Sequence, residues 1–261
     1  MGLTGADVCD VTVAFSRALG EPSRDFVVLA EGKTSLRGDI GTMFVKVSGS
    51  RLPTATPDNF VHVDWSALVA VVDSDTDDGD GADLVAVALT AARCDGSEDH
   101  RRPSAESLLD AVCCYEDPGV GAVAHTHPTP VVSLLCSNRA EALTAGSLFP
   151  DQIVVRGRHP LLVGYLDRGL PLARGTLAAV RNRRAAHGQT LRVIYFRDHG
   201  VFALGRGPGN ALAITTMAVK CARVRQGAVA VGHPTYLEDA LAARIDTRLD
   251  EPLRRARLAE T

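Results

Sequence analysis

The sequence has little that would mark a membrane, secreted or nucleotide-binding protein. It has no basic excess, since 28 Lys and Arg residues stand against 31 Asp and Glu residues, and this argues against nucleic acid or a membrane surface as a partner. The longest uncharged stretch, residues 118–138, contains two His and three Pro residues and therefore does not predict a membrane span. The first ten residues lack the basic start and apolar run of a signal peptide. No Walker lysine loop or GxGxxG motif follows a predicted strand, which excludes the usual nucleotide cofactors.

Paired cysteines and repeats are also missing. The six Cys residues, at positions 9, 94, 113, 114, 136 and 221, show no CxxC spacing and are typical of reduced thiols. Gly, Pro and charged residues follow no fixed period, which excludes collagen, solenoid and coiled-coil folds. The remaining composition, 46% hydrophobic and 23% charged over 261 residues, is that of a soluble protein with a buried core. We therefore expect a cytoplasmic protein with one domain over residues 1–261.

Helix-like and strand-like segments alternate along the chain. Helical spacing of apolar residues predicts helices at about 6–19, 64–72, 104–115, 129–136, 169–187, 208–228 and 237–258. Between residues 25 and 50 the pattern predicts a strand at DFVVLA, a glycine loop, a strand, a turn at Gly38–Gly41 and another strand. The runs VGAVAHTH, QIVVRG, LRVIYF and VFALG predict further strands. Since no boundary interrupts this alternation, we expect one α/β domain with a central mixed β-sheet flanked by helices on both faces.

An acidic, glycine-rich segment, DSDTDDGDGADL, covers residues 73–84. Its carboxylates are similar to those of a calcium loop, but it lacks the spacing and the closing Glu of an EF-hand. A solvated loop is therefore the favoured interpretation, with a calcium site as the alternative.

Three histidines come at the ends of predicted strands. Because side chains alternate along a strand, His125 and His127 project to the same side while Thr126 points away. His199 follows the strand LRVIYF and precedes Gly200, which permits a sharp departure of the backbone. Three such imidazoles are the ligands that a catalytic zinc needs, with positions left open for substrate oxygens. Three unrelated histidines are the alternative that these residues leave open.

A carboxylate and two small-residue turns complete the candidate site. Glu106 lies in the first turn of the helix predicted to begin at Ser104, where it either caps the helix or, beside a metal, carries protons to and from a carbon. The turns Gly32–Ser35 and Ser48-Gly49 are rich in N–H and hydroxyl donors that can hold an anion. Of only three lysines in the chain, Lys33 and Lys46 flank these turns, which indicates an anionic substrate.

Five segments, in order, resemble the class II aldolase/adducin family over about residues 6–230: AEGKTSLRG, FVKVSGSRL, RRPSAESLLDAV, VAHTHPTPVVSLLCS and FRDHGVFALGRG. The resemblance implies that His125, His127 and His199 hold a divalent metal. Zn²⁺ is the expected ion, with Mn²⁺, Co²⁺ or Fe²⁺ as alternatives. It also implies that Glu106 is the catalytic acid/base.

The same resemblance implies a substrate site and an assembly. Gly32, the Ser48-Gly49 turn and Ser104 match phosphate-binding positions of the family. Family aldolases are homotetramers with sites between subunits and an aromatic residue donated by the neighbour, for which Tyr236 is the candidate here. We therefore expect a homotetramer that binds a small anionic substrate.

The chain departs from the family pattern at three positions near these motifs. Lys33 stands where the family usually has a substrate-binding Asn, Ala105 replaces a second Ser, and Asp110 stands where related proteins often have His. A carboxylate or phosphonate paired with Lys33 is therefore an alternative to a phosphate. The chain keeps the three His residues and the Glu, which disfavours the adducin-like members that lack metal ligands and bind partners instead.

The function predicted from these residues is metal-dependent aldol cleavage or formation with a ketose phosphate-like substrate, through an enediolate. Three alternatives share the same site. One is a decarboxylase, dehydratase or epimerase of a small sugar acid or sugar phosphate. The others are a non-heme iron oxygenase and a non-catalytic, adducin-like binding module.

Overall fold

Seven strands form one mixed sheet at the centre of the computed structural model, which describes residues 5–39, 41–74, 82–94, 101–188 and 191–248. The strands are β1 (Lys33–Arg37), β2 (Thr42–Lys46), β3 (Phe60–Asp64), β4 (Ala122–Thr126), β5 (Leu161–Val163), β6 (Val193–Phe196) and β7 (Val201–Gly205). Their order across the sheet is β3-β2-β1-β4-β7-β6-β5. Neighbouring strands are antiparallel except for β5 and β6, which run parallel. Strand β4 lies in the middle of the sheet and pairs with β7. The segment that follows β4 and the segment that precedes β7 are therefore held in place by buried strands.

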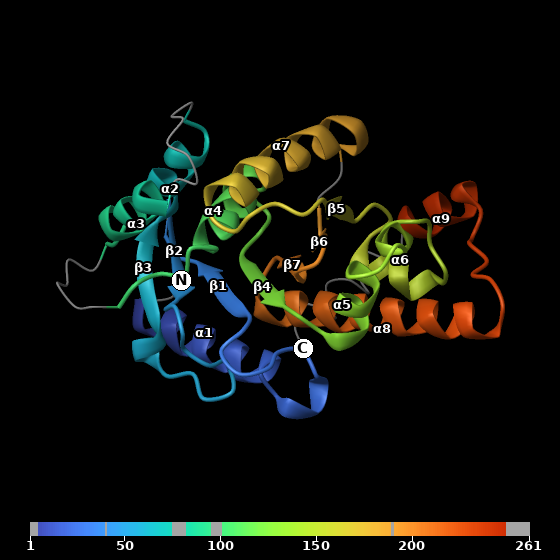
Figure 1. The fold of residues 1–261 in the computed structure, drawn as a ribbon, viewed down its shortest axis with the longest axis horizontal. Coiled ribbons are helices and arrows are strands. Elements are labelled where there is room, and N and C mark those ends of the chain that lie inside the picture. The colour runs from blue at the N-terminus through green and yellow to red at the C-terminus, as the bar shows by residue number, and fades with distance from the viewer. Residues whose placement is uncertain (1–4, 40, 75–81, 95–100, 189–190, 249–261) are drawn as a thin grey trace.

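Helices cover both faces of this sheet (Figure 1). They are α1 (Gly5–Leu19), α2 (Trp65–Val72), α3 (Ala82–Ala91), α4 (Ser107–Glu116), α5 (Thr129–Leu135), α6 (Pro150–Arg156), α7 (Leu170–His187), α8 (Pro208–Val231) and α9 (Asp239–Asp246). Three short 3₁₀ turns lie at Pro22–Arg24, Pro57–Asn59 and Ala140–Leu143. Helices α2, α3, α4 and α7 pack on one face, and α1, α5 and α8 pack on the other.

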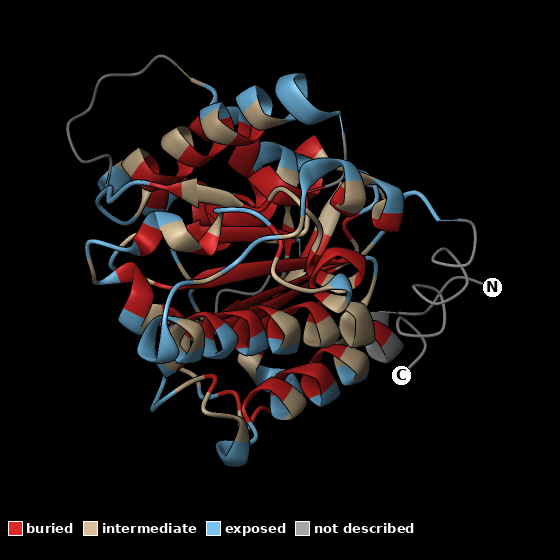
Figure 2. Cartoon of the chain, turned by 90° about the vertical axis from the view of Figure 1, so that its right-hand side faces the viewer, coloured by how far each residue is buried: buried red, intermediate tan, exposed pale blue. Residues whose placement is uncertain are grey.

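The core is therefore divided into two apolar layers, one on each side of the strands. Figure 2 shows the buried strands between helices whose outer surfaces are exposed. This arrangement confirms the predicted α/β fold with a central mixed sheet between two helical layers. Among the described residues, none of the helices combines the length and the apolar character needed to cross a membrane.

The start of α2 shows how local sequence fixes an element. The Asp64 carboxylate accepts hydrogen bonds from the backbone N–H groups of Ser66 at 2.7 Å and Ala67 at 3.4 Å, which is the standard N-cap arrangement. Leu68 and Val72, four residues apart, then bury one side of the helix against the sheet. The predicted helix over 64–72 is confirmed. Strand β3 directly before it was not predicted.

One predicted strand, QIVVRG, is wrong. Its residues form α6, which begins at Pro150. Proline suits the first helical position, because its fixed φ is helical and the N–H group that it lacks would have no partner within the helix there. The Gln152 amide accepts from the Leu148 N–H and donates to the Gly146 carbonyl, and this bridge anchors the loop before the helix. The Ile153 side chain is buried against α9 rather than in the sheet. A short apolar run cannot by itself distinguish a strand from a buried helix.

The strand predicted at DFVVLA is also wrong. Asp25 and Leu29 have positive φ values of 54° and 56°, which interrupt an extended conformation. Val28 and Leu29 are 56% and 73% exposed, so their apolar character does not reflect burial in a sheet. The segment is an irregular loop, and its Phe26 carbonyl accepts a hydrogen bond from the His127 N–H at 2.9 Å.

Two other predictions are only partly within the described residues. The acidic segment 73–84 is described up to residue 74 and from residue 82 onward, so the choice between a loop and a calcium site lies outside the described residues. The helix predicted at 237–258 is present as α9 over Asp239–Asp246, and residues after 248 are outside the description.

Candidate metal centre

The pairing of β4 with β7 brings the three histidines together. His125 pairs with Phe202, and Thr126 pairs with Val201, the first residue of β7. The turn that precedes β7, which contains His199, must therefore lie beside the end of β4 and the residue that follows it, His127. This placement depends on the antiparallel register of two strands that are about 75 residues apart in the chain.

A glycine keeps the two segments close. A Cβ atom at Gly200 would lie 2.4 Å from the His127 ring and 2.7 Å from the Thr126 carbonyl oxygen. The sharp turn that the sequence suggested for this glycine is made instead at Asp198, whose φ is 56°. Gly200 therefore provides room for the imidazole of His127 rather than unusual backbone freedom.

The three imidazoles converge at one point. The Nε2 atoms of His125 and His127 are 2.9 Å apart, and one nitrogen from each of the three rings lies within 4.8 Å of the others. Four-coordinate zinc, about 2.0–2.1 Å from each nitrogen, requires nitrogens separated by about 3.3 Å. The 2.9 Å between the nitrogens of His125 and His127 is near this value, and three imidazoles are a donor set that divalent transition metals prefer. Among the described residues, these histidines fit a divalent metal ion.

Glu106 bridges two of these histidines. Its Oε2 lies 3.0 Å from His125 Nδ1, and its Oε1 lies 3.1 Å from His199 Nε2. The predicted start of its helix needs correction, because α4 begins at Ser107 and Glu106 is the residue just before it. Ser104 does not act as the N-cap of α4, although its hydroxyl accepts from the Glu106 N–H at 3.4 Å. Instead, the Ser104 N–H donates to the carbonyl of Lys46 on β2, which holds this segment extended.

Burial and hydrogen bonding fix the charges of this pair. Burial lowers the pKa of His125 to about 3, so its imidazole is neutral near pH 7 and keeps a lone pair for a metal. Burial alone would raise the pKa of Glu106. The contacts with His125 and His199 and the nearby charge of Lys33 outweigh this and hold the pKa of Glu106 below its ordinary value. Glu106 is therefore an ionised carboxylate beside neutral imidazole.

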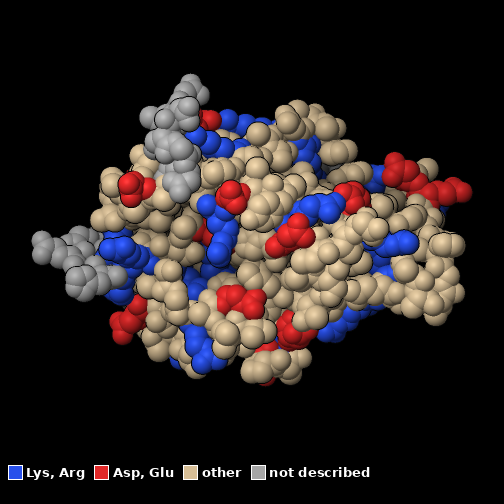
Figure 3. Space-filling model, in the orientation of Figure 1, with Lys and Arg blue, Asp and Glu red and all other residues tan. Residues whose placement is uncertain are grey.

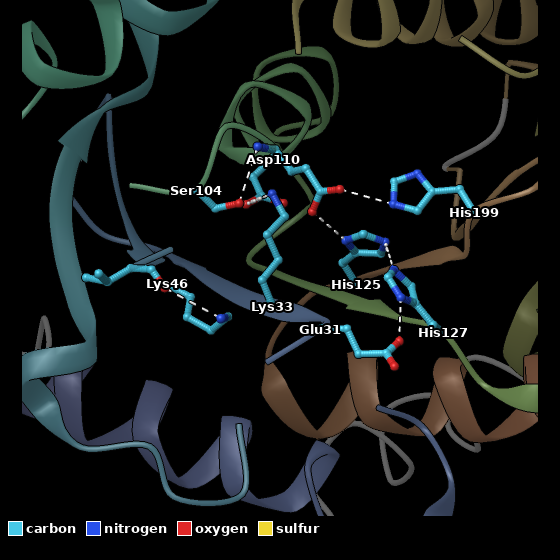
Figure 4. A network of polar contacts seen from close by, with 10 residues as sticks. Glu31, Lys33, Lys46, Ser104, Asp110, His125, His127 and His199 are labelled. Atoms are coloured by element: carbon cyan, nitrogen blue, oxygen red, sulfur yellow. Dashed lines mark hydrogen bonds and ion pairs between the residues drawn. The ribbon is translucent and has the colours of Figure 1, made fainter. Parts of the chain in front are cut away.

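A second carboxylate, which the sequence analysis missed, orients His127. Glu31 Oε2 lies 2.6 Å from His127 Nδ1, and Figure 4 shows Glu31 on the opposite side of this ring from His125. A carboxylate that accepts from Nδ1 leaves Nε2 free to bind a metal. The neighbouring Gly32, with φ 72°, lets the loop approach β4, since a Cβ there would lie 2.9 Å from the His125 carbonyl oxygen. Only knowledge of the pairing between β1 and β4 would have pointed to Glu31.

Lys33 forms a buried ion pair with Asp110. The predicted turn at Gly32–Ser35 is wrong from its second residue on, because Lys33 begins β1 and pairs with His125 in the adjacent strand. Its Nζ lies 2.8 Å from Asp110 Oδ2, and the two side chains are 2% and 0% exposed. Figure 4 shows the Lys33 side chain reaching up to α4, close to Ser104. The ammonium group is therefore fixed beside Glu106 rather than free in a loop.

The remaining residues expected to bind an anion lie on the same side. The Ser48-Gly49 turn follows β2, and the Ser48 N–H donates to the Arg102 carbonyl, so the turn lies beside the segment that contains Ser104. Gly49 has φ 79° and open space where a Cβ would stand. Lys46 is buried and donates to the carbonyls of Val47 and Ser50, so it supports this turn from within the chain.

Tyr236 is held within its own chain. Its hydroxyl accepts from Arg225 Nη1 at 2.7 Å, and its ring packs against Gly146. It lies in the segment between α8 and α9, at the end of the molecule away from β4 (Figure 1). A contribution of Tyr236 to a neighbouring subunit's site stays a prediction.

The fold agrees with the comparisons to known proteins. Residues 12–226 match the family described as Class II Aldolase and Adducin N-terminal domain. The match covers most of the chain, so the protein belongs to this family. Among curated proteins, none matches the chain at a significant level.

Solved structures share the fold at low sequence identity. An L-fuculose 1-phosphate aldolase superimposes with a TM-score of 0.70 and 19% identity, over 94% of this chain and 96% of its own. YgbL from Klebsiella pneumoniae, described as a putative aldolase/epimerase/decarboxylase, gives a TM-score of 0.69 and 16% identity, over 94% and 100%. The N-terminal class II aldolase domain of a conserved Thermoplasma acidophilum protein gives 0.63 and 23%, over 86% and 95%. At these identities the likeness establishes the fold.

Proposed function

We propose that His125, His127 and His199 bind one divalent metal ion, with Zn²⁺ as the expected ion and Mn²⁺, Co²⁺ or Fe²⁺ as alternatives. The observation that carries this proposal is the convergence of three imidazole nitrogens within 4.8 Å, with Glu106 in contact with two of the rings. When bound, such an ion stabilises negative charge on substrate oxygens as a Lewis acid. The partly exposed rings of His127 and His199, at 22% and 15%, leave a side from which a substrate can approach.

The proposed reaction is aldol cleavage or formation with a small ketose phosphate-like substrate. Glu106 is the base and acid for the carbon next to the substrate carbonyl, because its carboxylate is ionised and 15% exposed beside the histidines. In cleavage, the hydroxyl on the leaving carbon gives its proton to water as its C–O bond becomes the C=O bond of the aldehyde. The electron pair of the broken carbon–carbon bond stays on the donor fragment as an enediolate, and Glu106 takes up a proton from water and delivers it to this carbon. Lys33, whose charge lies near Glu106, helps to keep that carboxylate ionised between turnovers.

The anionic end of the substrate is assigned to the side of the cluster that holds Gly32, Lys33, Ser48-Gly49 and Ser104. Figure 4 shows Lys33 and Ser104 on one side of His125 and His199 on its other side. The described part of the surface seen in Figure 3 has acidic and basic side chains intermixed, which favours a small anion over a polyanion as the ligand. A homotetramer in the cytoplasm remains our prediction for the assembly and its location.

A decarboxylase, dehydratase or epimerase is the second candidate. Loss of CO₂ from a 3-keto acid leaves the same enediolate, so only the leaving group changes. The fold neighbour YgbL is described as a putative aldolase/epimerase/decarboxylase. An oxygenase would require Fe²⁺ in the site.

The test combines metal content with turnover. We expect about one divalent ion per chain by plasma mass spectrometry, and release of an aldehyde from a ketose 1-phosphate. Glu106→Gln should keep the metal and lose at least about 100-fold in turnover, since general acid–base catalysis contributes 10²–10⁴-fold. Glu238→Gln, at an exposed glutamate just before α9, is the matched control and should behave like the wild type.

Other results would change the assignment. Full activity in Glu106→Gln would remove Glu106 from the chemistry. Iron as the only ion that supports turnover would favour the oxygenase. Absence of metal after reconstitution would mean that the histidines do not bind a metal ion. The alternative of a non-catalytic, adducin-like binding module would then be favoured.

A further inference from the structure

A pocket with a volume of about 350 Å³ opens on the His127 and His199 side of the cluster. Its outer wall is the segment 164–168 between β5 and α7, and Leu172 and Phe196 lie deeper. None of the residues assigned above to the anionic end of the substrate lines this pocket. It is therefore a second space next to the proposed metal, on the other side from Lys33 and Ser104 (Figure 4).

Two of the charged side chains that line this pocket, Arg168 and Asp198, have no partner of opposite charge in the described part of the chain. Arg197 forms an ion pair with Glu141, and Asp198 lies against the Cys136 thiol. Arg168 is exposed and makes no hydrogen bond or ion pair with any residue in the described part of the chain. Of the two arginines that line the pocket, Arg168 is therefore the one that has no carboxylate partner.

The lining also includes apolar side chains beside the charged and polar ones. These are Leu166, Leu172 and Phe196, and Leu166 is 38% exposed. The exposed Tyr165 also lines the pocket, and its hydroxyl donates to Asp167 Oδ1 at 3.2 Å. A ligand that fits this lining has a polar reactive end at the histidines, a short hydrocarbon section and an anionic far end.

We propose that Arg168 determines the specificity for the second fragment of the aldol reaction, and that this fragment is an aldehyde that carries a carboxylate. The inference rests on the proposed function, because it uses the histidine cluster as the place of reaction. A planar guanidinium binds a carboxylate through two parallel hydrogen bonds, and its single charge matches a monoanion. The substrate would then be anionic at both ends, with one end on each side of the cluster.

The carboxylate takes no part in the bond change. In the synthetic direction, Glu106 removes a proton from the donor carbon, and this carbon forms the new bond to the aldehyde carbon. The electron pair of the aldehyde C=O bond moves to its oxygen, which takes a proton from water and becomes a hydroxyl group. Arg168 only holds the far end of the aldehyde and thereby directs its carbonyl carbon to the donor.

The experiment uses pairs of aldehydes with equal chain length. Succinic semialdehyde and its neutral analogue butanal are each offered with dihydroxyacetone phosphate to the metal-loaded protein, and kcat/KM for each aldehyde is measured. We expect Arg168→Met to lower the ratio of kcat/KM for the anionic over the neutral aldehyde about 10–100-fold, the usual effect of a lost charged hydrogen bond. Arg168→Lys should retain part of the preference. Arg206→Met, at an exposed arginine just beyond the opposite end of β7, is the matched control.

An unchanged ratio in Arg168→Met would overturn the proposal, as would an equal loss with both aldehydes, which would indicate a structural role. If the wild type joins neither aldehyde to the donor, the proposed aldol function fails instead. Titration of succinate into the metal-loaded protein then tests separately whether Arg168 binds a carboxylate. Weaker binding by Arg168→Met than by Arg206→Met supports the anion site, and equal binding overturns it.

Discussion

The contact between Glu31 and His127 predicts a defined change in metal affinity. Glu31 Oε2 accepts from His127 Nδ1 at 2.6 Å, which fixes the tautomer whose Nε2 faces the other histidines. Loss of such a partner typically lowers metal affinity 10–100-fold, or about 1.4–2.7 kcal/mol. The side chains of His127 and Glu31 are 22% and 31% exposed, so water can partly replace the lost acceptor. We therefore expect the lower end, about tenfold, for Glu31→Ala.

The assay is a competitive zinc titration with a chelating dye. Glu31→Gln should lie between the wild type and Glu31→Ala, because the amide oxygen still accepts from Nδ1 but without the charge. Glu21→Gln, at an exposed glutamate before the first 3₁₀ turn, should bind zinc like the wild type. His127→Ala should abolish tight binding. Unchanged affinity in Glu31→Ala would refute the orienting role, and a loss as large as that of His127→Ala would make Glu31 a ligand itself.

Two further predictions concern buried lysines. Burial, with the nearby charge of Lys33, lowers the pKa of Lys46 from 10.5 to about 8. The unfolded state therefore binds more protons between these values, so burial of Lys46 costs most below pH 8 and the cost is relieved as the pH rises. Relative to Lys46→Met, the wild type should gain about 2 kcal/mol of unfolding free energy between pH 7 and 9.5, measured by urea unfolding; no change in this difference would contradict the shift. Lys33→Met should cost about 3–5 kcal/mol, because it leaves Asp110 buried without a counter-charge. The double variant Lys33→Met/Asp110→Leu should recover most of this in calorimetric melting, and equal losses in both variants would show that the pair itself is not the cause.

Local patterns in the sequence predicted those parts of the site that depend on one element. The two-residue spacing in β4 was enough to place His125 and His127 on one side, and their Nε2 atoms are 2.9 Å apart. The position of His199 follows only from the pairing of β4 with β7, which no local pattern contains. For the same reason, the residues alone left Glu106 as either a helix cap or an acid/base, and only the resemblance to a family favoured the second role. Glu31, 96 residues away from His127 in sequence, was missed.

The wrong predictions have a related cause. In QIVVRG and DFVVLA, apolar residues were taken as evidence of a sheet. Burial in the first comes from helix packing against α9, and the second is a loop in which Phe26 is buried while Val28 and Leu29 are exposed. Tertiary contacts, which periodicity over six residues cannot detect, decide the structure of such short runs. The late start of α4 is similar, because a backbone bond between Ser104 and Lys46, 58 positions apart, delays the helix.

The ion pair also explains two departures from the family pattern as one change. Lys33 in place of Asn and Asp110 in place of His look independent in the sequence, since 77 residues separate them. In the structure their charged atoms are 2.8 Å apart and both side chains are buried, so neither charge is tolerated without the other. A lysine alone at position 33 would add a buried positive charge beside Glu106, and an aspartate alone at position 110 would add a buried negative charge near the same carboxylate. The pair therefore keeps the charge around Glu106 close to that of a neutral Asn and His, while it replaces an amide by a charged donor at the side of the cluster assigned to the substrate anion.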